Sequence, residues 1–381
     1  MNFNELRTAI IHHWFLNVTG GERVVEALCE LFDKPDLFAI VAAPQALSPT
    51  LRNCNLVTSF VQSLPASISR HEYYAFLFPS AVELFDVSQY DLVISSDAST
   101  AKGVITRPET CHICYCHSPM RYAWNLFQEY LPKRSSLRRL MVALLMHYLR
   151  LWDHAASSRV DFFIANSQAV RARIRKYYRR DSRLIYPPCD VGQFQVSSRI
   201  DDYYLAVGRL VGYKRIDLAV EAFALSGRRL LVVGEGPAKS QLKAMAPSNV
   251  EFLGWIAQGE LAELYKHCRA LIFPGEEDFG IVSVEAQASG RPVVAYGKGG
   301  ALETVIPGTT GLLFFDQSPQ ALNAAVEKLE AQMDEFDPKV MRANAERFSK
   351  ERFLREFAEF TEACFNQHRA GVSPNAGDIA L

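Results

Sequence analysis

Two glutamates and two basic residues in the carboxyl-terminal half have the types and spacing to hold hydroxyl and phosphate groups. Glu277 and Glu285 are eight residues apart, so the first can lie in a loop at a helix entrance and the second about one turn inside the helix. Carboxylates placed in this way can accept hydrogen bonds from two separate sets of hydroxyl groups. Arg209 and Lys214 lie in GRLVGYKR, directly after an expected strand, and offer a guanidinium fork and a point charge that can hold a diphosphate. The competing interpretations are a helix-start carboxylate for Glu277 and exposed loop charges for the basic pair.

Two features of the amino-terminal half could contact a ligand. Gly20 and Gly21 follow the first expected strand and precede the helical pattern ERVVEALCELF. Paired glycines at such a place let the backbone approach a phosphate and point free amides at it. His117 ends the expected strand 110–117, and the carboxyl ends of strands are where open α/β sheets bind ligands. A tight turn and a packed histidine are the respective alternatives.

Cys111, Cys114 and Cys116, beside two histidines on the same strand, suggest zinc. Alternate residues of a strand face opposite ways, however, so these side chains do not converge on one ion. We therefore expect no metal site.

The motif GEGP, at 234–237, resembles half of a dinucleotide-binding loop. Glu251, at the end of the following expected strand, could then be the acid that holds a ribose in an NAD-dependent oxidoreductase. Lys239 occupies the position of the third glycine, which weakens this interpretation.

The composition is that of a globular protein of two to three domains. Its 381 residues are 49% hydrophobic, 11% aromatic and 22% charged, which is average for a chain with a large buried core. Forty-one basic and 42 acidic residues give a net charge of -1, so we expect no nucleic-acid partner. Eight irregularly spaced cysteines, no signal-peptide pattern and no apolar window of about 18 residues predict a cytoplasmic protein.

Short apolar runs alternate with helical patterns along most of the chain, which predicts parallel sheets covered by helices on both faces. Two Rossmann-like domains follow, at 1–187 and 188–349, with a linker at 186–198 that begins with a Pro-Pro pair. Residues 349–370 are expected to form one long final helix. The expected strands are 8–15, 36–42, 91–95, 112–116, 161–165, 184–186, 203–207, 230–233, 250–253, 270–273, 292–295 and 311–314.

Taken together, the motifs resemble a known family. The paired-glutamate segment 274–285 is similar to the signature of glycosyltransferase family 4, retaining enzymes of the GT-B fold. GRLVGYKRIDLAVEAF, VVGEGP, NVEFLGW and SGRPVVAYGKGGALETVIPGTTGLLF match its carboxyl-terminal half in order, while GGERVVEAL and YCHSPMRYAW resemble mannosyltransferases that build bacterial surface polysaccharides. The resemblance, over about residues 8–365, implies an α/β GT-B fold. In that fold two Rossmann-like domains face each other across a cleft, and the final helix, at about 350–370, packs back on the first domain.

The resemblance also implies a role for each matching residue. Arg209 and Lys214 would hold the donor diphosphate, and Glu285 would bind the nucleotide ribose. Glu277 and His117 would be catalytic, with Glu277 on the sugar hydroxyls near the reacting carbon and His117 facing the donor sugar. The other residues assigned to donor binding are Gly20 and Gly21 as a phosphate loop, the backbone around Trp255 and Ile256 for the base, and Asp278, Phe279, Gly280 and Ile281.

The implied reaction is transfer of a hexose, with mannose from GDP-mannose as the first choice, onto a growing or polyprenyl-linked surface polysaccharide. Breaking the sugar–phosphate bond leaves negative charge on the diphosphate, which positioned Arg and Lys side chains stabilise. The sequence contains no Asp-x-Asp triplet, the usual way in which such an enzyme holds a cation, so we expect no cofactor and no metal. The alternatives are the oxidoreductase and a catalytically inactive nucleotide-sugar binding protein, which would lack the combination of His117 and Glu277.

A basic segment predicts peripheral contact with an anionic membrane at the cytoplasmic face. Residues 133–183 carry 13 basic and 3 acidic side chains, and each cation near an anionic leaflet contributes roughly 1 kcal/mol. The run RARIRKYYRRDSR, at 171–183, supplies seven of these cations. Upstream of it, apolar residues recur at steps of three and four, and a helix packed on its own sheet is the alternative explanation of that stripe. The stripe is Leu137, Leu140, Met141, Leu144, Leu145, Tyr148, Leu151 and Trp152, flanked by Arg138, Arg139 and Arg150.

Overall fold

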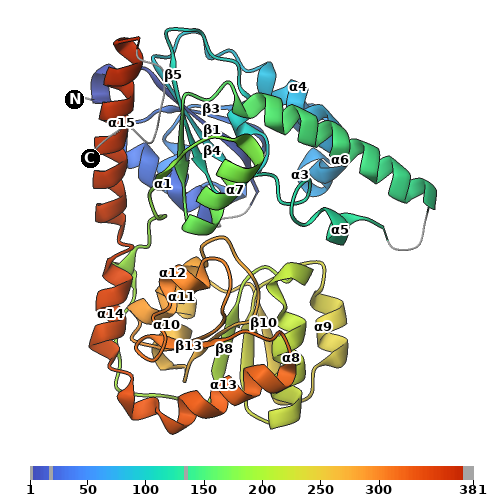
Figure 1. Cartoon of the computed structure of the whole chain (residues 1–381), viewed down its shortest axis with the longest axis vertical. Helices are drawn as coiled ribbons and strands as arrows, with labels where there is room; N and C mark the ends of the chain where they lie inside the picture. Colours follow the sequence, from blue (N-terminus) through green and yellow to red (C-terminus); the bar gives the residue numbers. More distant parts are fainter. Residues whose placement is uncertain (1–2, 17–19, 133–135, 372–381) are drawn as a thin grey trace. The chain divides into compact units, whose positions relative to one another are not determined.

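The computed structural model describes residues 3–16, 20–132 and 136–371 (Figure 1). The chain divides into two compact units, Met1–Tyr186 with Phe353–Leu381 (unit 1) and Pro187–Arg352 (unit 2). Each unit holds a parallel sheet with helices on its faces (Figure 1), because strands that are continuous apolar runs need cover on both sides. The expected α/β class with two Rossmann-like sheets is confirmed. Within the described ranges, no helix is both long and apolar enough to cross a membrane.

Unit 1 contains a seven-stranded sheet in the order β3-β2-β1-β4-β5-β6-β7. Ile10 of the central strand β1 lies opposite Leu37 of β2 on one side and Ile94 of β4 on the other. The strands are β1 (Thr8–Phe15), β2 (Asp36–Ala42), β3 (Leu56–Thr58), β4 (Leu92–Asp97), β5 (Cys111–Cys116), β6 (Phe162–Ala165) and β7 (Arg183–Leu184). The helices are α1 (Gly20–Leu31), α2 (Pro49–Arg52), α3 (Ser67–Arg70), α4 (Phe78–Glu83), α5 (Phe127–Tyr130), α6 (Ser136–Ser157) and α7 (Gln168–Tyr178).

Helix α15 (Lys350–Arg369) belongs to unit 1 from Phe353 onward. Phe353, Phe357 and Phe360 are fully buried in the core of unit 1. Their neighbours come from far earlier in the chain, since Tyr115 of β5 lies 5.7 Å from Phe353 and Phe32 lies 6.3 Å from Phe357, measured between ring centroids. Burying a side chain of this size contributes about 1.5–3 kcal/mol, so α15 is an integral part of the core of unit 1.

Unit 2 contains a six-stranded sheet in the order β10-β9-β8-β11-β12-β13. The direction of winding reverses between β8 and β11, and ligands of such sheets bind beyond the carboxyl ends of the strands at that point. The strands are β8 (Tyr204–Val207), β9 (Leu230–Val233), β10 (Val250–Gly254), β11 (Leu271–Phe273), β12 (Val293–Tyr296) and β13 (Gly311–Phe314). The helices are α8 (Ile216–Ser226), α9 (Lys239–Met245), α10 (Gln258–His267), α11 (Ile281–Ala288), α12 (Ala301–Thr304), α13 (Pro319–Ala331) and α14 (Pro338–Glu346).

Each of the twelve expected strands overlaps an observed one, and the structure adds β3. This strand has only three residues, none of them buried, at the edge of its sheet. A short, partly exposed edge strand carries no apolar run, so the pattern along the chain gave no indication of it.

Candidate functional site

The loops that follow β8 and β11 bring Lys214 and Glu277 together at the switch point of unit 2. Nζ of Lys214 lies 2.8 Å from Oε1 of Glu277, and the two side chains are 15% and 17% exposed. Lys214 is the last residue of a short 3-10 helix, Gly212–Lys214, and Glu277 lies between β11 and α11. The pair is shielded from most solvent yet keeps an exposed part that a ligand can contact.

Glycines allow the loops to approach closely enough for this pair to form. A Cβ atom on Gly275 would lie 2.7 Å from the Cα atom of Lys214 and from the carbonyl oxygen of Tyr213. A Cβ atom on Gly208, where φ is +149°, would lie 2.9 Å from Nζ of Lys214. Any larger residue at either position would displace the lysine or its loop.

The loop after β12 holds the backbone of Glu277. The N–H of Gly300 donates to the carbonyl oxygen of Glu277 at 2.9 Å, and a Cβ atom on Gly299 would lie 2.3 Å from the same oxygen. Nζ of Lys298 lies 2.9 Å from Oε2 of Glu276. The adjacent glutamates 276 and 277 therefore each have a lysine partner, from two different loops. No role was predicted for GKGG, although its paired glycines were a usable signal.

The charge of Lys214 is set by its surroundings. Burial tends to lower the pKa of Lys214, but the charge of Glu277, the nearby Tyr213 and Asp278, and the hydrogen bond to Glu277 together raise this pKa above its ordinary value. Lys214 is therefore protonated at neutral pH. Its ammonium group has three N–H donors, so it can keep Glu277 as a partner and still donate to phosphate oxygens.

Glu285 is the fifth residue of α11, which begins after Gly280 with its φ of +83°. The side chain is buried, and Oε2 accepts a hydrogen bond from the hydroxyl of Tyr265 at 3.0 Å. This bond orients the carboxylate that is predicted to hold a ribose. Tyr265 comes from α10 and is fully buried, and no motif in the sequence pointed to it.

The remaining residues predicted to bind the donor in unit 2 differ in exposure. Phe279 is buried and packs on Phe348, with the ring centroids 5.4 Å apart. Arg209 is exposed, and so is Trp255, which follows the edge strand β10. The half-buried residues are Asp278, Ile281 and Ile256. The donor-binding roles of these residues remain predictions.

The glycines of GEGP are explained by packing between loops of unit 2. A Cβ atom on Gly234 would lie 2.0 Å from the carbonyl oxygen of Gly208, and one on Gly236 would lie 2.4 Å from that of Leu210. Both glycines are thus required by contact with the loop after β8, and neither needs a bound dinucleotide to account for it.

Glu251 does not occupy the position expected of a ribose-binding acid. It is the second residue of β10 and so lies at the amino end of the strand, where we had expected the carboxyl end. Its Oε2 lies 3.3 Å from a guanidinium nitrogen of Arg229, and both side chains are more than half exposed. Ligands of such sheets bind at the opposite end of the strands, so the prediction for Glu251 was wrong.

In unit 1, His117 follows β5 and lies beside residues of β1, β4 and α1. Nε2 of His117 is 2.8 Å from Oγ of Ser96 on β4, and Nδ1 of His12 on β1 is 3.2 Å from the same hydroxyl. A Cβ atom on Gly21 would lie 3.2 Å from Cε1 of His12 and 3.7 Å from Nε2 of His117. The structure thus brings Gly21 and His117 together, while Gly20 is exposed at the first residue of α1. His12 and Ser96 belong to no motif and were not predicted.

A further histidine, His13, is adjacent to this group. Burial, followed by the nearby charges of His12 and His117, lowers the pKa of His13 well below its ordinary value. His13 is therefore neutral at neutral pH and adds no charge beside His117.

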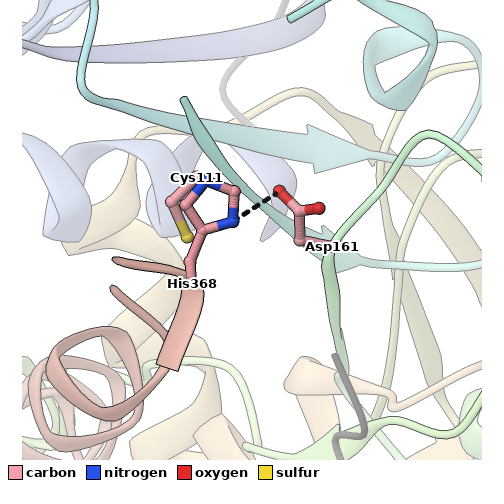
Figure 2. A group of neighbouring side chains, drawn as sticks. All are labelled: Cys111, Asp161 and His368. Atoms are coloured by element: carbon pink, nitrogen blue, oxygen red, sulfur yellow. Dashed lines mark ion pairs between the residues drawn. The ribbon is translucent and has the colours of Figure 1, made fainter. Parts of the chain in front are cut away.

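Three possible metal ligands of unit 1 lie near one another away from His117 (Figure 2). Atoms of Cys111, Asp161 and His368 lie within 4.8 Å of one another. Oδ2 of Asp161 already accepts the backbone N–H of His112 at 2.8 Å and lies 3.7 Å from Nδ1 of His368. The group lies at the amino ends of β5 and β6, the end opposite to His117. The contact between His368 of α15 and Asp161 beside the sheet accounts for the position of these side chains. We assign no metal to the group.

Comparison with known proteins matches both halves of the chain to family models. "Glycosyltransferase Family 4" matches residues 18–193, and "Glycosyl transferases group 1" matches residues 194–348. The chain is 29% identical over 198 residues to a D-inositol 3-phosphate glycosyltransferase of Segniliparus rotundus, and this match covers 44% of each of the two chains. It is 39% identical over 108 residues to a GDP-mannose-dependent alpha-mannosyltransferase of Mycobacterium tuberculosis, and this match covers 28% of each of the two chains. The chain thus spans less than half the length of these curated relatives.

Among solved structures, a sucrose-phosphate synthase from Thermosynechococcus elongatus has a similar fold. The TM-score is 0.72 at 21% identity, over 94% of this chain and 99% of that one. At this identity the likeness concerns the fold, which is the two-domain glycosyltransferase fold expected from the sequence.

Proposed function

This chain belongs to the glycosyltransferases of family 4, and from that premise we propose that it transfers a hexose from a nucleotide diphosphate sugar to a glycan acceptor with retention of configuration. The observation that carries the proposal is the pair of Lys214 and Glu277, 2.8 Å apart, at the switch point of unit 2. A protonated lysine can bind a diphosphate, and a carboxylate at the same place can accept hydrogen bonds from sugar hydroxyls.

The proposed chemistry follows from where charge develops. As the bond between the anomeric carbon and the phosphate oxygen breaks, the diphosphate gains negative charge and the sugar gains positive charge. Lys214 is held in place by Gly208, Gly275 and Glu277, so it stabilises the leaving diphosphate without having to reorganise. Arg209, exposed on the same loop, adds a second cation. Glu277 stabilises the sugar through its hydroxyl groups.

The proposed donor is GDP-mannose, and the proposed acceptor is a growing or polyprenyl-linked surface polysaccharide. The motifs GGERVVEAL and YCHSPMRYAW support this choice, and so does the relative named as a GDP-mannose-dependent alpha-mannosyltransferase. In this proposal Glu285 binds the ribose of the donor, the backbone at Trp255 and Ile256 meets the base, and His117 contacts the sugar.

A ligand screen tests the proposed donor class. The thermal unfolding of the protein is recorded with GDP-mannose, UDP-glucose, GDP, UDP and NAD⁺. A ligand at 100 times its dissociation constant stabilises the folded state by about 2.7 kcal/mol. We expect protection by GDP-mannose and GDP. Protection by NAD⁺ alone would instead support the oxidoreductase, and protection without any turnover of GDP-mannose would support an inactive binding protein.

Gly21 gives a prediction about the group of residues around His117 in unit 1. Replacing Gly21 with Ala should lower the rate of transfer about tenfold, because the added Cβ atom presses on His12 and overpacking costs about 1–3 kcal/mol. Gly259→Ala is the matched control, since Gly259 is likewise the second residue of a helix, α10, and a Cβ atom there meets nothing within 4 Å. Steady-state rates with the donor found in the screen provide the measurement, and equal rates for the two variants would contradict the assignment of Gly21.

Activity should survive chelation of metal ions. Two cationic side chains are available for the charge of the leaving group, and the sequence contains no Asp-x-Asp triplet. We expect the rate in excess EDTA to equal the rate in buffer. Loss of activity in EDTA that magnesium or manganese restores would overturn the proposal of a metal-free site.

Helix α6 supports a second proposal, peripheral contact of unit 1 with an anionic membrane. Six apolar side chains of α6 are between 44% and 69% exposed: Leu137, Leu140, Met141, Leu144, Tyr148 and Leu151. Leu149, on another face, is buried in a cluster with Met120 and Ala123. The alternative that this stripe packs on its own sheet is therefore wrong for these six residues. An exposed apolar row of this length is typical of a contact surface.

Most cations of the basic segment fall into two groups, and Lys133 and Arg134 lie outside the described residues. Arg150 donates to the carbonyl oxygen of Ala123 and lies over the ring of Trp124, so it is part of the fold. Arg180 donates to the carbonyl oxygens of Ser157 and Asp161 and is likewise engaged. The exposed cations are Arg138 and Arg139 at the start of α6, and Arg171, Arg175, Lys176 and Arg179 in the second run. Their charged groups lie at the surface, where they can face an anionic leaflet.

Sedimentation with vesicles tests this surface. Wild type should bind anionic phosphatidylglycerol vesicles at low salt and less at high salt or on neutral phosphatidylcholine. Exchanging both Leu140 and Leu144 for Glu should lower the partition coefficient at least about tenfold, since each buried leucine contributes roughly 1.5–3 kcal/mol. Leu225→Glu is the control, because this leucine of unit 2 is at least as exposed, at 67%. Equal binding of all three proteins would refute the contact through α6.

A further inference from the structure

A chain of buried polar side chains lies next to His117 in unit 1. Glu22 is 3% exposed, His12 is 1% exposed and Ser96 is fully buried. Oε1 of Glu22 lies 3.9 Å from Nε2 of His12, whose other ring nitrogen faces Ser96. The hydroxyl of Ser96 then reaches His117. Glu22 comes from α1, His12 from β1 and Ser96 from β4, so three separate elements build the chain.

The position of the proton on His12 follows from its partner. Nδ1 of His12 is 3.0 Å from the backbone carbonyl oxygen of Ser96. A carbonyl oxygen can only accept a hydrogen bond, so Nδ1 of His12 carries a hydrogen. Oε1 of Glu22 lies 3.9 Å from the other nitrogen, beyond hydrogen-bond distance. Nδ1 of His12 is therefore the donor whether the ring is neutral or charged.

The direction of the next hydrogen bond follows in turn. Nδ1 of His12 also lies 3.2 Å from Oγ of Ser96, so this hydroxyl oxygen accepts a share of the same N–H. This oxygen has a second lone pair, but we take the hydroxyl hydrogen to point at Nε2 of His117, 2.8 Å away, because this nitrogen is the acceptor that the described part of the chain places beside it. A nitrogen that accepts a hydrogen bond carries no proton, and in a neutral imidazole the proton must be on the other nitrogen.

We propose that Ser96 and His12 are positioning residues that hold His117 in the tautomer with its proton on Nδ1. This inference rests on the proposed function, in which His117 contacts the donor sugar. With Nε2 occupied by the serine hydroxyl, His117 acts on the ligand as an N–H donor and not as a base. Burial keeps water from replacing either hydrogen bond, so the ring orientation is also fixed.

The tautomer itself is measured by long-range ¹H–¹⁵N correlation spectra of the full chain labelled with ¹⁵N-histidine. The His117 signals are assigned by their loss in His117→Gln. We expect Nδ1 of His117 to show the shift of a protonated nitrogen and Nε2 that of an unprotonated acceptor. The opposite pattern would overturn the inference. Ser96→Ala should abolish the preference and give a mixture of both tautomers.

Two substitutions of His12 give a matched kinetic test. The amide nitrogen of Asn can take the place of Nδ1 of histidine, whereas the longer Gln places its amide near Nε2. His12→Asn should therefore keep most of the wild-type kcat, while His12→Gln and Ser96→Ala should lower kcat about tenfold with little change in the KM for the donor. Thermal unfolding curves establish that both His12 variants are folded. Equal kcat values for the two folded variants would then contradict the role of His12.

The results separate this inference from the proposed function. If the predicted tautomer is observed and no sugar nucleotide is turned over, the proposed function fails and the hydrogen-bond chain stands. If transfer occurs and Nε2 of His117 carries the proton, the function stands and the inference fails.

Discussion

Replacing Lys214 with Ala should lower kcat/KM for the donor about 100-fold or more, the size of effect seen when one positioned donor to a developing anion is removed. The ammonium group of Lys214 is partly buried beside Glu277, and the close contact with Gly208 leaves it little freedom. Its loss therefore removes a preorganised charge from the leaving diphosphate. Initial rates over a range of donor concentrations, together with calorimetric binding of the nucleoside diphosphate, provide the measurement.

Lys298 is the matched control for this substitution. Its ammonium group also pairs with a glutamate, Glu276, at 2.9 Å, but its side chain is 57% exposed. Exposed ion pairs contribute about 0–1 kcal/mol, so Lys298→Ala should change kcat/KM less than about fivefold. If Lys214→Ala kept both the wild-type rate and the wild-type affinity for the nucleoside diphosphate, the assignment of Lys214 would be refuted.

Glu277→Gln should lower kcat about 100-fold while the KM for the donor changes little, because an interaction that strengthens only in the transition state acts on kcat. Glutamine keeps the shape of the side chain but removes the negative charge with which, in the proposed mechanism, Glu277 stabilises the developing cation through the sugar hydroxyls. The same change also leaves Lys214 without its ionic partner, so the affinity for the nucleoside diphosphate should be measured alongside the rate.

Glu276→Gln is the control, since this residue is next in the chain and has its own lysine partner. Its rate should stay close to that of wild type. A result in which Glu276→Gln lost the activity and Glu277→Gln kept it would move the catalytic carboxylate to the neighbouring residue.

The sheets and the meeting of Lys214 with Glu277 were accessible from the sequence. Apolar runs marked all strands except β3, and GRLVGYKR and the paired glutamates each follow a strand. In the sheet of unit 2 these strands, β8 and β11, are neighbours. Their carboxyl ends therefore bring both loops to one edge of the sheet. There Nζ of Lys214 lies 2.8 Å from Oε1 of Glu277.

Features that depend on distant contacts were not accessible. Ser96 and His12 meet across two strands that are 84 residues apart in the chain, and nothing local distinguishes them from core residues. Tyr265 reaches Glu285 from a different helix. Gly275 is required only because the loop of Lys214 passes within contact distance of it.

Helix α6 shows a different limit. The spacing of its apolar residues predicted a stripe but could not say what covers it, since a core face and an exposed contact face have the same periodicity. Glu251 shows a third limit, because its place after GEGP suggested a ribose-binding acid although it is only the second residue of its strand, at the end of the sheet opposite to the ligand-binding end.

The proposed reaction is tested by following transfer of the sugar itself. Protein is incubated with ¹³C-labelled GDP-mannose and a bacterial polyprenyl-linked glycan extract in the presence of EDTA, and the lipid fraction is examined by NMR. We expect labelled mannose in α linkage, as in the donor, with release of one GDP for each sugar transferred. A β-linked product would contradict retention. Release of GMP with mannose 1-phosphate, or oxidation of the sugar with reduction of NAD⁺, would contradict glycosyl transfer itself.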